Sequence, residues 1–223
     1  MAYSPNCVGL AFKNEIAFCK TYLVCYYPDS TIAGFSHTHL SGTGAGDLYD
    51  ISYMPVTLPY REAEAPLGIH SKFRHSDEEA SAGYYRVLLK DYNINVELTA
   101  TERCGIQRYT FPKAQSAVFL NLKKAMNWDF TQDSHIEVVD SCTIQGYRFS
   151  DGWARGQRVF FRTRFSKPFR SSEIDTTAII QDGKTIGTAY VARFNFDTTD
   201  GEEIVLCTAL SGVSMEGAAG NPA

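Results

Sequence analysis

The clearest pattern along the chain is an alternation of apolar and polar residues with a period of two. Within Ile94–Ala100, Ile94, Val96 and Leu98 alternate with polar residues. Successive side chains of a strand point to opposite faces of a sheet, so this pattern predicts a strand with one buried face. Other alternations and short apolar runs predict strands at 48–55, 84–90, 105–111, 117–122, 136–139, 142–149, 159–165, 178–181, 185–196 and 204–210.

Turn-forming residues separate these segments. Asp182-Gly183 is the strongest two-residue hairpin signal in the chain, and Glu102–Gly105 marks another tight turn. Helical periodicity is almost absent. About ten short strands at close spacing predict an all-β fold, an antiparallel β-sandwich. The 223 residues fit one such domain, and a hydrophobic content of 44% is enough to bury a sizeable core.

Charge and cysteine content exclude several classes of protein. The net charge of −4 argues against a nucleic-acid partner, since neutralising phosphates requires a basic patch. Arg155, Arg158, Arg162 and Arg164 alternate with other residues and predict the solvated face of a strand. No apolar run approaches the roughly 20 residues of a transmembrane helix, and no basic segment precedes a signal-like apolar run. The six cysteines show no metal-binding spacing; free thiols are expected, and a Cys19–Cys25 disulfide stays open.

One stretch, Gly34–Asp47, does not follow the strand pattern. It contains two histidines, two serines, two threonines and several glycines, with few apolar residues to bury. Polar, glycine-rich loops of this kind lie at the surface and commonly carry binding or chemistry. We call Gly34–Asp47 the polar loop.

The composition of the polar loop allows three chemical interpretations. His37 and His39 can share one face of a strand and ligate a metal with Asp47, Asp50 or His75, but H-x-H alone is a weak signal and hydrogen bonds to loop carbonyls are favoured. The repeated glycines suggest a phosphate loop, yet no helix is predicted to follow. Ser36 and Ser41 lie close to histidines but lack the G-x-S-x-G elbow of a hydrolase.

Outside the polar loop the candidates are weaker. Asp77, Glu78 and Glu79 form an acidic run, which in a polar segment predicts a solvated surface and not a glycosidase acid–base pair. Trp153 follows a turn, where it can stack on a sugar or pack at the end of a strand. Trp128 is the other tryptophan.

Several ordered motifs resemble glycoside hydrolase family 92, the exo-acting α-mannosidases. The segment from Asp29 through Gly44, followed by Gly46-Asp47 and Met54-Pro55, resembles the motif near the start of that family. Further matches occur in the same order, at 73–85, 97–101, 108–112, 152–157, 165–169 and 209–217. The resemblance covers about residues 25–217.

This resemblance implies the N-terminal part of a two-domain enzyme. It implies a β-supersandwich of the galactose-mutarotase type at 25–213, an atypical segment at 1–24, and a linker at 214–223 toward a C-terminal helical catalytic domain. That domain would carry the acid, the base and most of a Ca²⁺ site, so no catalytic or metal-binding residue is expected here. Mannose-containing glycans are the implied ligands, and the bacterial periplasm, cell surface or exterior is the implied location. The expected substrate- or interface-proximal residues are His37, His39, Ser41, Thr43, Asp47, His75 and Trp153.

Two points stand against a complete substrate site. Thr21–Tyr27 has no tryptophan where the family has a tryptophan-containing segment, and residues 1–24 do not resemble the family's opening strands. The alternative is a free-standing carbohydrate-binding or interaction module. It predicts sugar affinity without a partner domain and a coding sequence that stops at Ala223.

Overall fold

The computed structural model describes residues 12–13, 30–38, 48–60, 69–123, 129–152, 154–181 and 184–221. The elements in chain order are β1 (Phe12–Lys13), β2 (Thr31–Gly34), β3 (Ser52–Thr57), β4 (Ser71–Lys72), the 3₁₀ turn η1 (His75–Asp77), β5 (Glu78–Ser81), β6 (Tyr84–Leu89), β7 (Ile94–Ala100), β8 (Cys104–Phe111), β9 (Ala114–Asn121), β10 (Phe130–Asp140), β11 (Thr143–Asp151), β12 (Gln157–Phe165), β13 (Ser171–Gln181), β14 (Lys184–Thr198), β15 (Glu202–Ser211) and α1 (Met215–Ala219).

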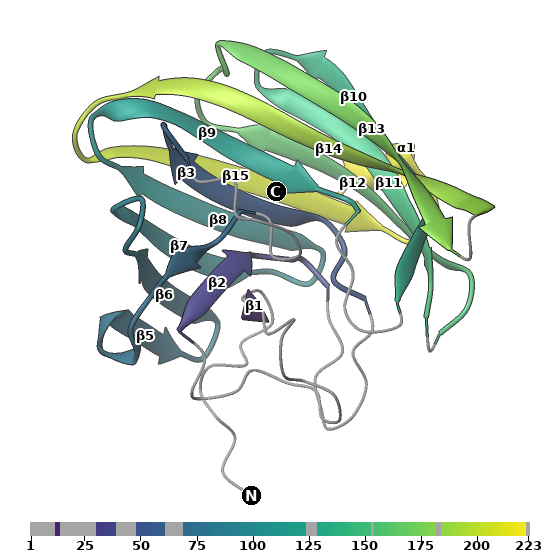
Figure 1. Ribbon diagram of the computed structural model, residues 1–223, viewed down its shortest axis with the longest axis horizontal. Coiled ribbons are helices and arrows are strands. Elements are labelled where there is room, and N and C mark those ends of the chain that lie inside the picture. Colours follow the sequence, from purple (N-terminus) through teal and green to yellow (C-terminus); the bar gives the residue numbers. More distant parts are fainter. Residues whose placement is uncertain are drawn as a thin grey trace, which may run out of the picture.

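The strands form an antiparallel sandwich (Figure 1). The larger sheet has eight strands in the order β10-β11-β12-β15-β8-β7-β6-β5, and the smaller one has four in the order β13-β14-β9-β3. A three-stranded sheet, β1-β2-β4, continues the smaller one through a bridge between Phe35 and Tyr53. The predicted all-β sandwich is therefore confirmed.

The core lies between the two large sheets. Inward positions of the eight-stranded sheet contribute Phe161 and Phe165, and those of the four-stranded sheet contribute Phe194 and Phe196, all at most 2% exposed. The rings of Phe165 and Phe194 lie 5.3 Å apart across the interface. These are the alternate residues that the period-two pattern assigns to the buried face, because side chains alternate across a strand.

The main strands follow the sequence prediction, with shifts at the ends. β7 has the predicted bounds, whereas β10 and β13 are considerably longer than the apolar runs from which they were predicted. The predicted run 136–139 forms the end of β10, and the strand begins earlier, at Phe130. The added residues 131–135 are polar and carry no apolar alternation, but they pair with β11 and so belong to the strand.

The polar segment Lys72–Ser81 departs from expectation. It ends β4 and contains η1 and β5. Glu78, expected in a solvated acidic run, has a side chain only 6% exposed. Its carboxylate accepts hydrogen bonds from the Tyr85 hydroxyl and from Nδ1 of His75, at 2.5 Å each. The expectation was wrong for Glu78 because it belongs to β5, which pairs with β6. Side chains alternate along this strand, and that of Glu78 lies on the less exposed side.

The C-terminal segment 214–223, expected as a linker, contains the short helix α1. The Ser214 side chain caps this helix by accepting a hydrogen bond from the Gly217 amide at 3.0 Å, and Ala218 is fully buried. Within the described residues, no helix is long and apolar enough to span a membrane.

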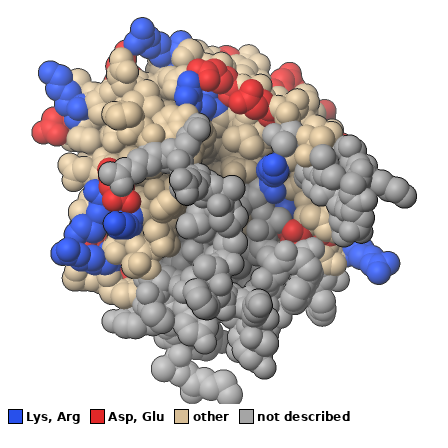
Figure 2. Space-filling model, viewed as in Figure 1, with Lys and Arg blue, Asp and Glu red and all other residues tan. Residues whose placement is uncertain are grey.

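Surface charges also fit the predicted pattern. Arg158 and Arg164 are exposed and Arg162 is half-buried, as expected for the outer side of β12, whereas the exposed Arg155 lies in the bend before that strand. Figure 2 shows basic and acidic side chains intermixed around one face of the molecule. Cys104, Cys142 and Cys207 are free, which confirms the prediction of free thiols for these three; Cys7, Cys19 and Cys25 lie outside the described residues.

Candidate functional site

A cavity of about 520 Å³ opens at the end of the sandwich where the polar loop begins. His37 and Thr38 form one wall, and the first residues of β8 form another. Val159, Leu210 and the residues around α1 complete the lining. The cavity therefore brings the base of the polar loop together with residues 210–221.

The backbone that leads into and out of the polar loop is unusual. Gly34 has φ +151°, and a Cβ there would lie 2.5 Å from the Ser52 hydroxyl oxygen, so only glycine fits. On the return side, Leu48, Tyr49 and Ile51 have φ values of 75°, 89° and 55°. Non-glycine residues rarely adopt this region, and such strain persists only where surrounding contacts enforce it.

His37 is held as a neutral imidazole. Its Nδ1 lies 2.8 Å from the Ile51 carbonyl oxygen, to which it donates, and its Nε2 lies 3.5 Å from the Gln107 side-chain nitrogen. Gln107 is oriented in turn by the Tyr109 hydroxyl, which donates to its Oε1. Burial lowers the pKa of His37 to about 4, because the charged imidazolium would lose its hydration.

The close packing of His37 depends on Gly105. A Cβ at Gly105 would lie 2.8 Å from Nε2 of His37 and closer still to Cδ2. The glycine at the start of β8 thus lets the imidazole lie flat against the strand. Both ring nitrogens face protein groups, which supports the hydrogen-bonding interpretation of His37 over the metal-ligand one.

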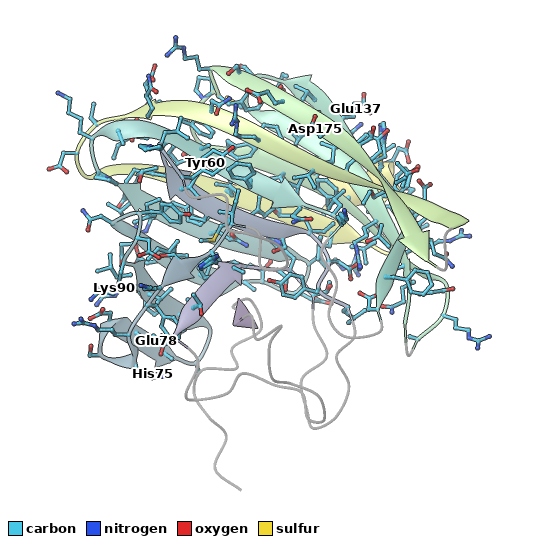
Figure 3. The ribbon with its side chains drawn as sticks, viewed as in Figure 1. Tyr60, His75, Glu78, Lys90, Glu137 and Asp175 are labelled. Atoms are coloured by element: carbon cyan, nitrogen blue, oxygen red, sulfur yellow. The ribbon has the colours of Figure 1, made fainter. Side chains whose placement is uncertain are left out.

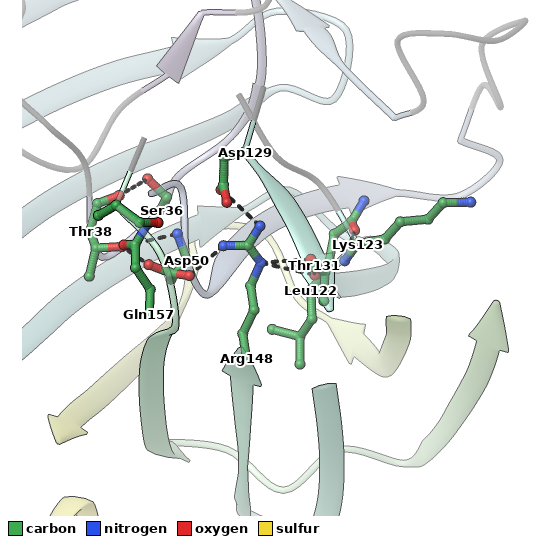
Figure 4. A network of polar contacts seen from close by, with 11 residues as sticks. Ser36, Thr38, Asp50, Leu122, Lys123, Asp129, Thr131, Arg148 and Gln157 are labelled. Atoms are coloured by element: carbon green, nitrogen blue, oxygen red, sulfur yellow. Dashed lines mark hydrogen bonds and ion pairs between the residues drawn. The ribbon is translucent and has the colours of Figure 1, made fainter. Parts of the chain in front are cut away.

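Beside this wall, Arg148 of β11 is surrounded by acceptors (Figure 4). Its Nη1 lies 2.5 Å from Asp50 Oδ1, and its Nη2 lies 2.9 Å from Asp129 Oδ2. Its Nε donates to the Thr131 hydroxyl at 2.8 Å and to the Leu122 carbonyl at 3.2 Å. None of these three charged side chains is exposed to solvent. We call Arg148, Asp50 and Asp129 the arginine cluster.

The arginine cluster also closes the base of the polar loop. Thr38 donates its hydroxyl to Asp50 Oδ2 at 2.6 Å and accepts from the Asp50 amide at 3.0 Å. The Tyr49 amide donates to the Thr38 carbonyl oxygen at 3.2 Å. The two ends of the loop are therefore tied to each other and, through Asp50, to the eight-stranded sheet.

The described residues do not fit a calcium site. No group of three or more His, Cys, Asp and Glu side chains among them is arranged to hold a metal ion. Glu102 is the one carboxylate among the described residues that line the cavity, and the two carboxylates of the arginine cluster, Asp50 and Asp129, each contact the Arg148 guanidinium. A Ca²⁺ ion needs six to eight oxygen ligands, several of them free carboxylates. No step is therefore assigned to calcium within this part of the chain.

The described residues include only some of those that the sequence singled out. Among these, His37 lines the cavity, and Asp50 lies behind it in the arginine cluster. His75 lies with Glu78, away from the residues that line the cavity (Figure 3). His39, Ser41, Thr43, Asp47, Trp128 and Trp153 lie outside the described residues.

Sequence reasoning did not identify Arg148, Asp129 or Gln107. A signal for Arg148 was present in the alternation of β11, where Ile144, Gly146 and Arg148 share the inward face. A charged residue at an inward position requires buried partners of opposite charge. The partners themselves are too distant in sequence to be found from this pattern.

Comparisons with known proteins agree with this picture. The sequence profile of the glycosyl hydrolase family 92 N-terminal domain matches residues 15–211. A family GH92 α-mannosidase from Bacteroides thetaiotaomicron, solved in complex with mannoimidazole, is 31% identical with a TM-score of 0.76. The match covers 87% of this chain and 28% of that one.

More distant structures share the fold. An inverting GH92 mannosidase from Bacteroides thetaiotaomicron VPI-5482 is 23% identical over 86% of this chain and 26% of that one, with a TM-score of 0.65. The GH92 glycosyl hydrolase ccman5 is 25% identical over 86% of this chain and 28% of that one, with a TM-score of 0.66. No curated protein matches. The chain thus spans little more than a quarter of the length of these solved relatives.

Proposed function

Because the chain belongs to glycosyl hydrolase family 92, as the N-terminal domain of that family, we propose that it is a non-catalytic domain of an exo-acting α-mannosidase. In this proposal a second, helical domain carries the general acid, the general base and a Ca²⁺ ion. The two domains enclose the site for a terminal mannose, and the reaction inverts the anomeric configuration. The polar loop contributes hydroxyl and imidazole groups to that shared site, since these groups both donate to and accept from sugar hydroxyls.

The observation that carries the proposal is the composition of the cavity. Its wall combines the base of the polar loop with Val213 and Asn221, next to α1. A polypeptide that continues beyond α1 would therefore start beside the polar loop. Val213 is 84% exposed, which suits an apolar side chain that a following domain would cover.

The carboxylate content of the cavity supports a non-catalytic role. Glu102 is the single carboxylate among the described residues that line it. Glycoside hydrolysis requires two carboxyl groups on opposite sides of the scissile bond, about 5–9.5 Å apart. One carboxylate cannot supply both the acid and the base, so the catalytic pair is assigned to the second domain.

Activity measurements test this proposal. The 223-residue chain and a longer polypeptide carrying the following domain are compared on a terminal α-mannoside, each with Ca²⁺ and with a chelator. We expect turnover only from the longer polypeptide with Ca²⁺, and NMR of the first-formed sugar should show β-mannose. Calcium-dependent turnover by the 223-residue chain would contradict the non-catalytic role.

A further inference from the structure

A second hollow, of about 260 Å³, lies on the outer face of the four-stranded sheet. On β14, Arg193 and Asn195 face away from the buried Phe194 and Phe196 and help to line it. The remaining polar lining comes from Gln115 of β9 and from Arg170, Ser171 and Asp197. Nothing in the proposed function uses this hollow.

The hollow is distant from the cavity at the polar loop. The two share no lining residue among the described residues. Gln115 of β9 lines the hollow, whereas Leu122, just beyond β9, accepts from Arg148 of the arginine cluster, and the seven positions between them span about 23 Å at about 3.3 Å per residue. A ligand in the hollow would therefore not occupy the cavity.

The frame of the hollow is fixed by backbone hydrogen bonds. The Leu58 amide donates to the Gln115 carbonyl oxygen at 2.8 Å, which holds the chain after β3 against β9. The Arg170 amide donates to the Asn195 carbonyl oxygen at 2.8 Å, which holds the start of β13 against β14. Such a frame presents its side chains without needing to close around a ligand, which reduces the entropic cost of binding.

The charges of the hollow are balanced. Arg170 Nη1 lies 2.9 Å from Asp197 Oδ2, and an Arg193 guanidinium nitrogen pairs with the Glu173 carboxylate. An anion would have to compete with both carboxylates for the two guanidinium groups. A neutral ligand with many hydroxyls meets no such competition, because it can donate to a carboxylate and accept from a guanidinium or amide.

Hydrogen-bonding capacity remains for such a ligand. Asn195 Nδ2 donates to the Ser171 hydroxyl at 3.1 Å, and this donation leaves its carbonyl oxygen as an acceptor. Leu58, in the chain that follows β3, supplies apolar surface for the C–H groups of a sugar ring. At about 260 Å³ the hollow is slightly smaller than the roughly 300–1,000 Å³ of typical ligand pockets, so it can hold no more than one sugar ring.

We infer that this hollow is an accessory binding site for one neutral hexose unit of a glycan. Asn195 and Arg170 make the polar contacts that decide affinity. The choice of mannose as the first probe rests on the proposed function, but the position of the site and its preference for a neutral sugar do not.

Titration of the 223-residue chain tests the inference. Methyl α-mannoside, methyl α-glucoside, glucuronate and inorganic phosphate are added separately, and binding is followed by NMR chemical shifts and calorimetry. We expect at least one of the neutral glycosides to bind in the millimolar range. Asn195→Ala and Arg170→Ala should each weaken that binding at least tenfold. Arg86→Ala is the matched control: Arg86 is also a surface arginine paired with a carboxylate, Glu79, but it lies on the other sheet.

The outcomes separate this inference from the proposed function. Loss of binding in the Asn195 and Arg170 variants, with no loss in the Arg86 variant, supports the site whichever neutral sugar binds. A preference for glucoside over mannoside would count against the proposed mannosidase and leave the site intact. Binding of phosphate or glucuronate alone, binding insensitive to Asn195, or no binding of either glycoside would each overturn the inference.

Discussion

Arg148 and Asp50 are 98 residues apart in sequence, yet they form an ion pair with a nitrogen–oxygen distance of 2.5 Å in which neither side chain is exposed. The pair joins the centre of β11 to the end of the polar loop. Asp129, which directly precedes β10, accepts from the same guanidinium. One arginine therefore holds both the residues that follow the polar loop and the residue that precedes β10. Burying three charges is costly unless each has its hydrogen-bond partners, and here the protein provides those partners for Arg148.

Replacing Arg148 by methionine should therefore be strongly destabilising. The substitution keeps much of the side-chain volume but leaves Asp50 and Asp129 buried without their cation. Breaking a buried pair in this way costs about 3–5 kcal/mol. Urea unfolding at neutral pH measures the loss.

Arg170→Ala provides the contrast for that experiment. Arg170 and Asp197 are also paired at 2.9 Å, but their side chains are 69% and 60% exposed. Exposed pairs contribute at most about 1 kcal/mol, so this variant should unfold almost as the parent does. If the Arg148 and Arg170 variants lost the same free energy of unfolding, the buried arginine cluster would contribute no more to stability than an exposed ion pair does.

Gly105→Ala should displace His37. The new Cβ would overlap the imidazole, which is enclosed by Ile51 and Gln107 and cannot move without losing those contacts. Inserting one methyl group into a well-packed site typically costs about 1–3 kcal/mol. Thermal unfolding measures this cost, and a change in the NMR signals of His37 would identify its cause. Gly212→Ala is the control, because nothing lies within 4 Å of a Cβ at Gly212; a similar loss there would point to a general effect of removing glycine.

Stability should fall at mildly acidic pH because of His37. Its pKa is about 4 in the folded protein and near 6.5 in the unfolded chain. Below about pH 6.5 the unfolded chain binds a proton that the folded protein does not, so acid favours unfolding until pH 4 is reached. At pH 5 the loss relative to pH 7.5 should be about 1–2 kcal/mol, given 1.36 kcal/mol per pKa unit and the half-buried position of the ring.

The contribution of His37 is isolated by subtracting His37→Gln. Both proteins are unfolded in urea at pH 7.5 and pH 5, and the difference between the two pH values is compared. Between pH 7.5 and pH 5, the free energy of unfolding should fall more in the parent protein than in the His37→Gln variant. An identical pH dependence in the two proteins would mean that His37 titrates as it does in the unfolded chain.

The Glu78 contacts predict a stability effect away from the cavity. Glu78→Ala removes the carboxylate that accepts hydrogen bonds from the buried Tyr85 hydroxyl and from His75. A hydrogen bond to a charged group contributes about 1.5–3 kcal/mol. Unfolding measurements should show this loss, whereas Glu79→Ala should have little effect, because the Glu79 side chain is 59% exposed. If the two variants unfold alike, Glu78 is not a buried acceptor in solution.

The sandwich was predictable from sequence because the patterns that specify its strands and turns lie within short segments of the chain. Most strands of the large sheets show alternation or an apolar run within a few residues, as in Ile94–Ala100, although β5 does not. The pairing of Gln181 with Lys184 also agrees with the hairpin signal at Asp182-Gly183. Strand ends were less predictable. β10 begins at Phe130, before the predicted run 136–139, and its polar residues 131–135 belong to the strand because they pair with β11. That pairing cannot be read from the sequence of β10 alone.

The candidate site was predictable only in part, because its determinants are non-local. The polar loop and His37 stand out by composition, whereas the partners of Arg148 come from segments that meet only in the folded chain. Glu78 illustrates the same limit. Its position in an acidic run indicates a surface, and only the pairing of β5 with β6 brings its carboxylate to Tyr85.

The position of β15 in the eight-stranded sheet has a consequence for how this domain folds. β15 pairs with β12 on one side and with β8 on the other, so it joins the β10–β12 group to the β5–β8 group. During synthesis these two groups emerge first and cannot be joined in their native order until residues 202–211 have left the ribosome. Sheet completion is thus a late, long-range event, which favours slow folding and a need for chaperone protection of the nascent half-sheets.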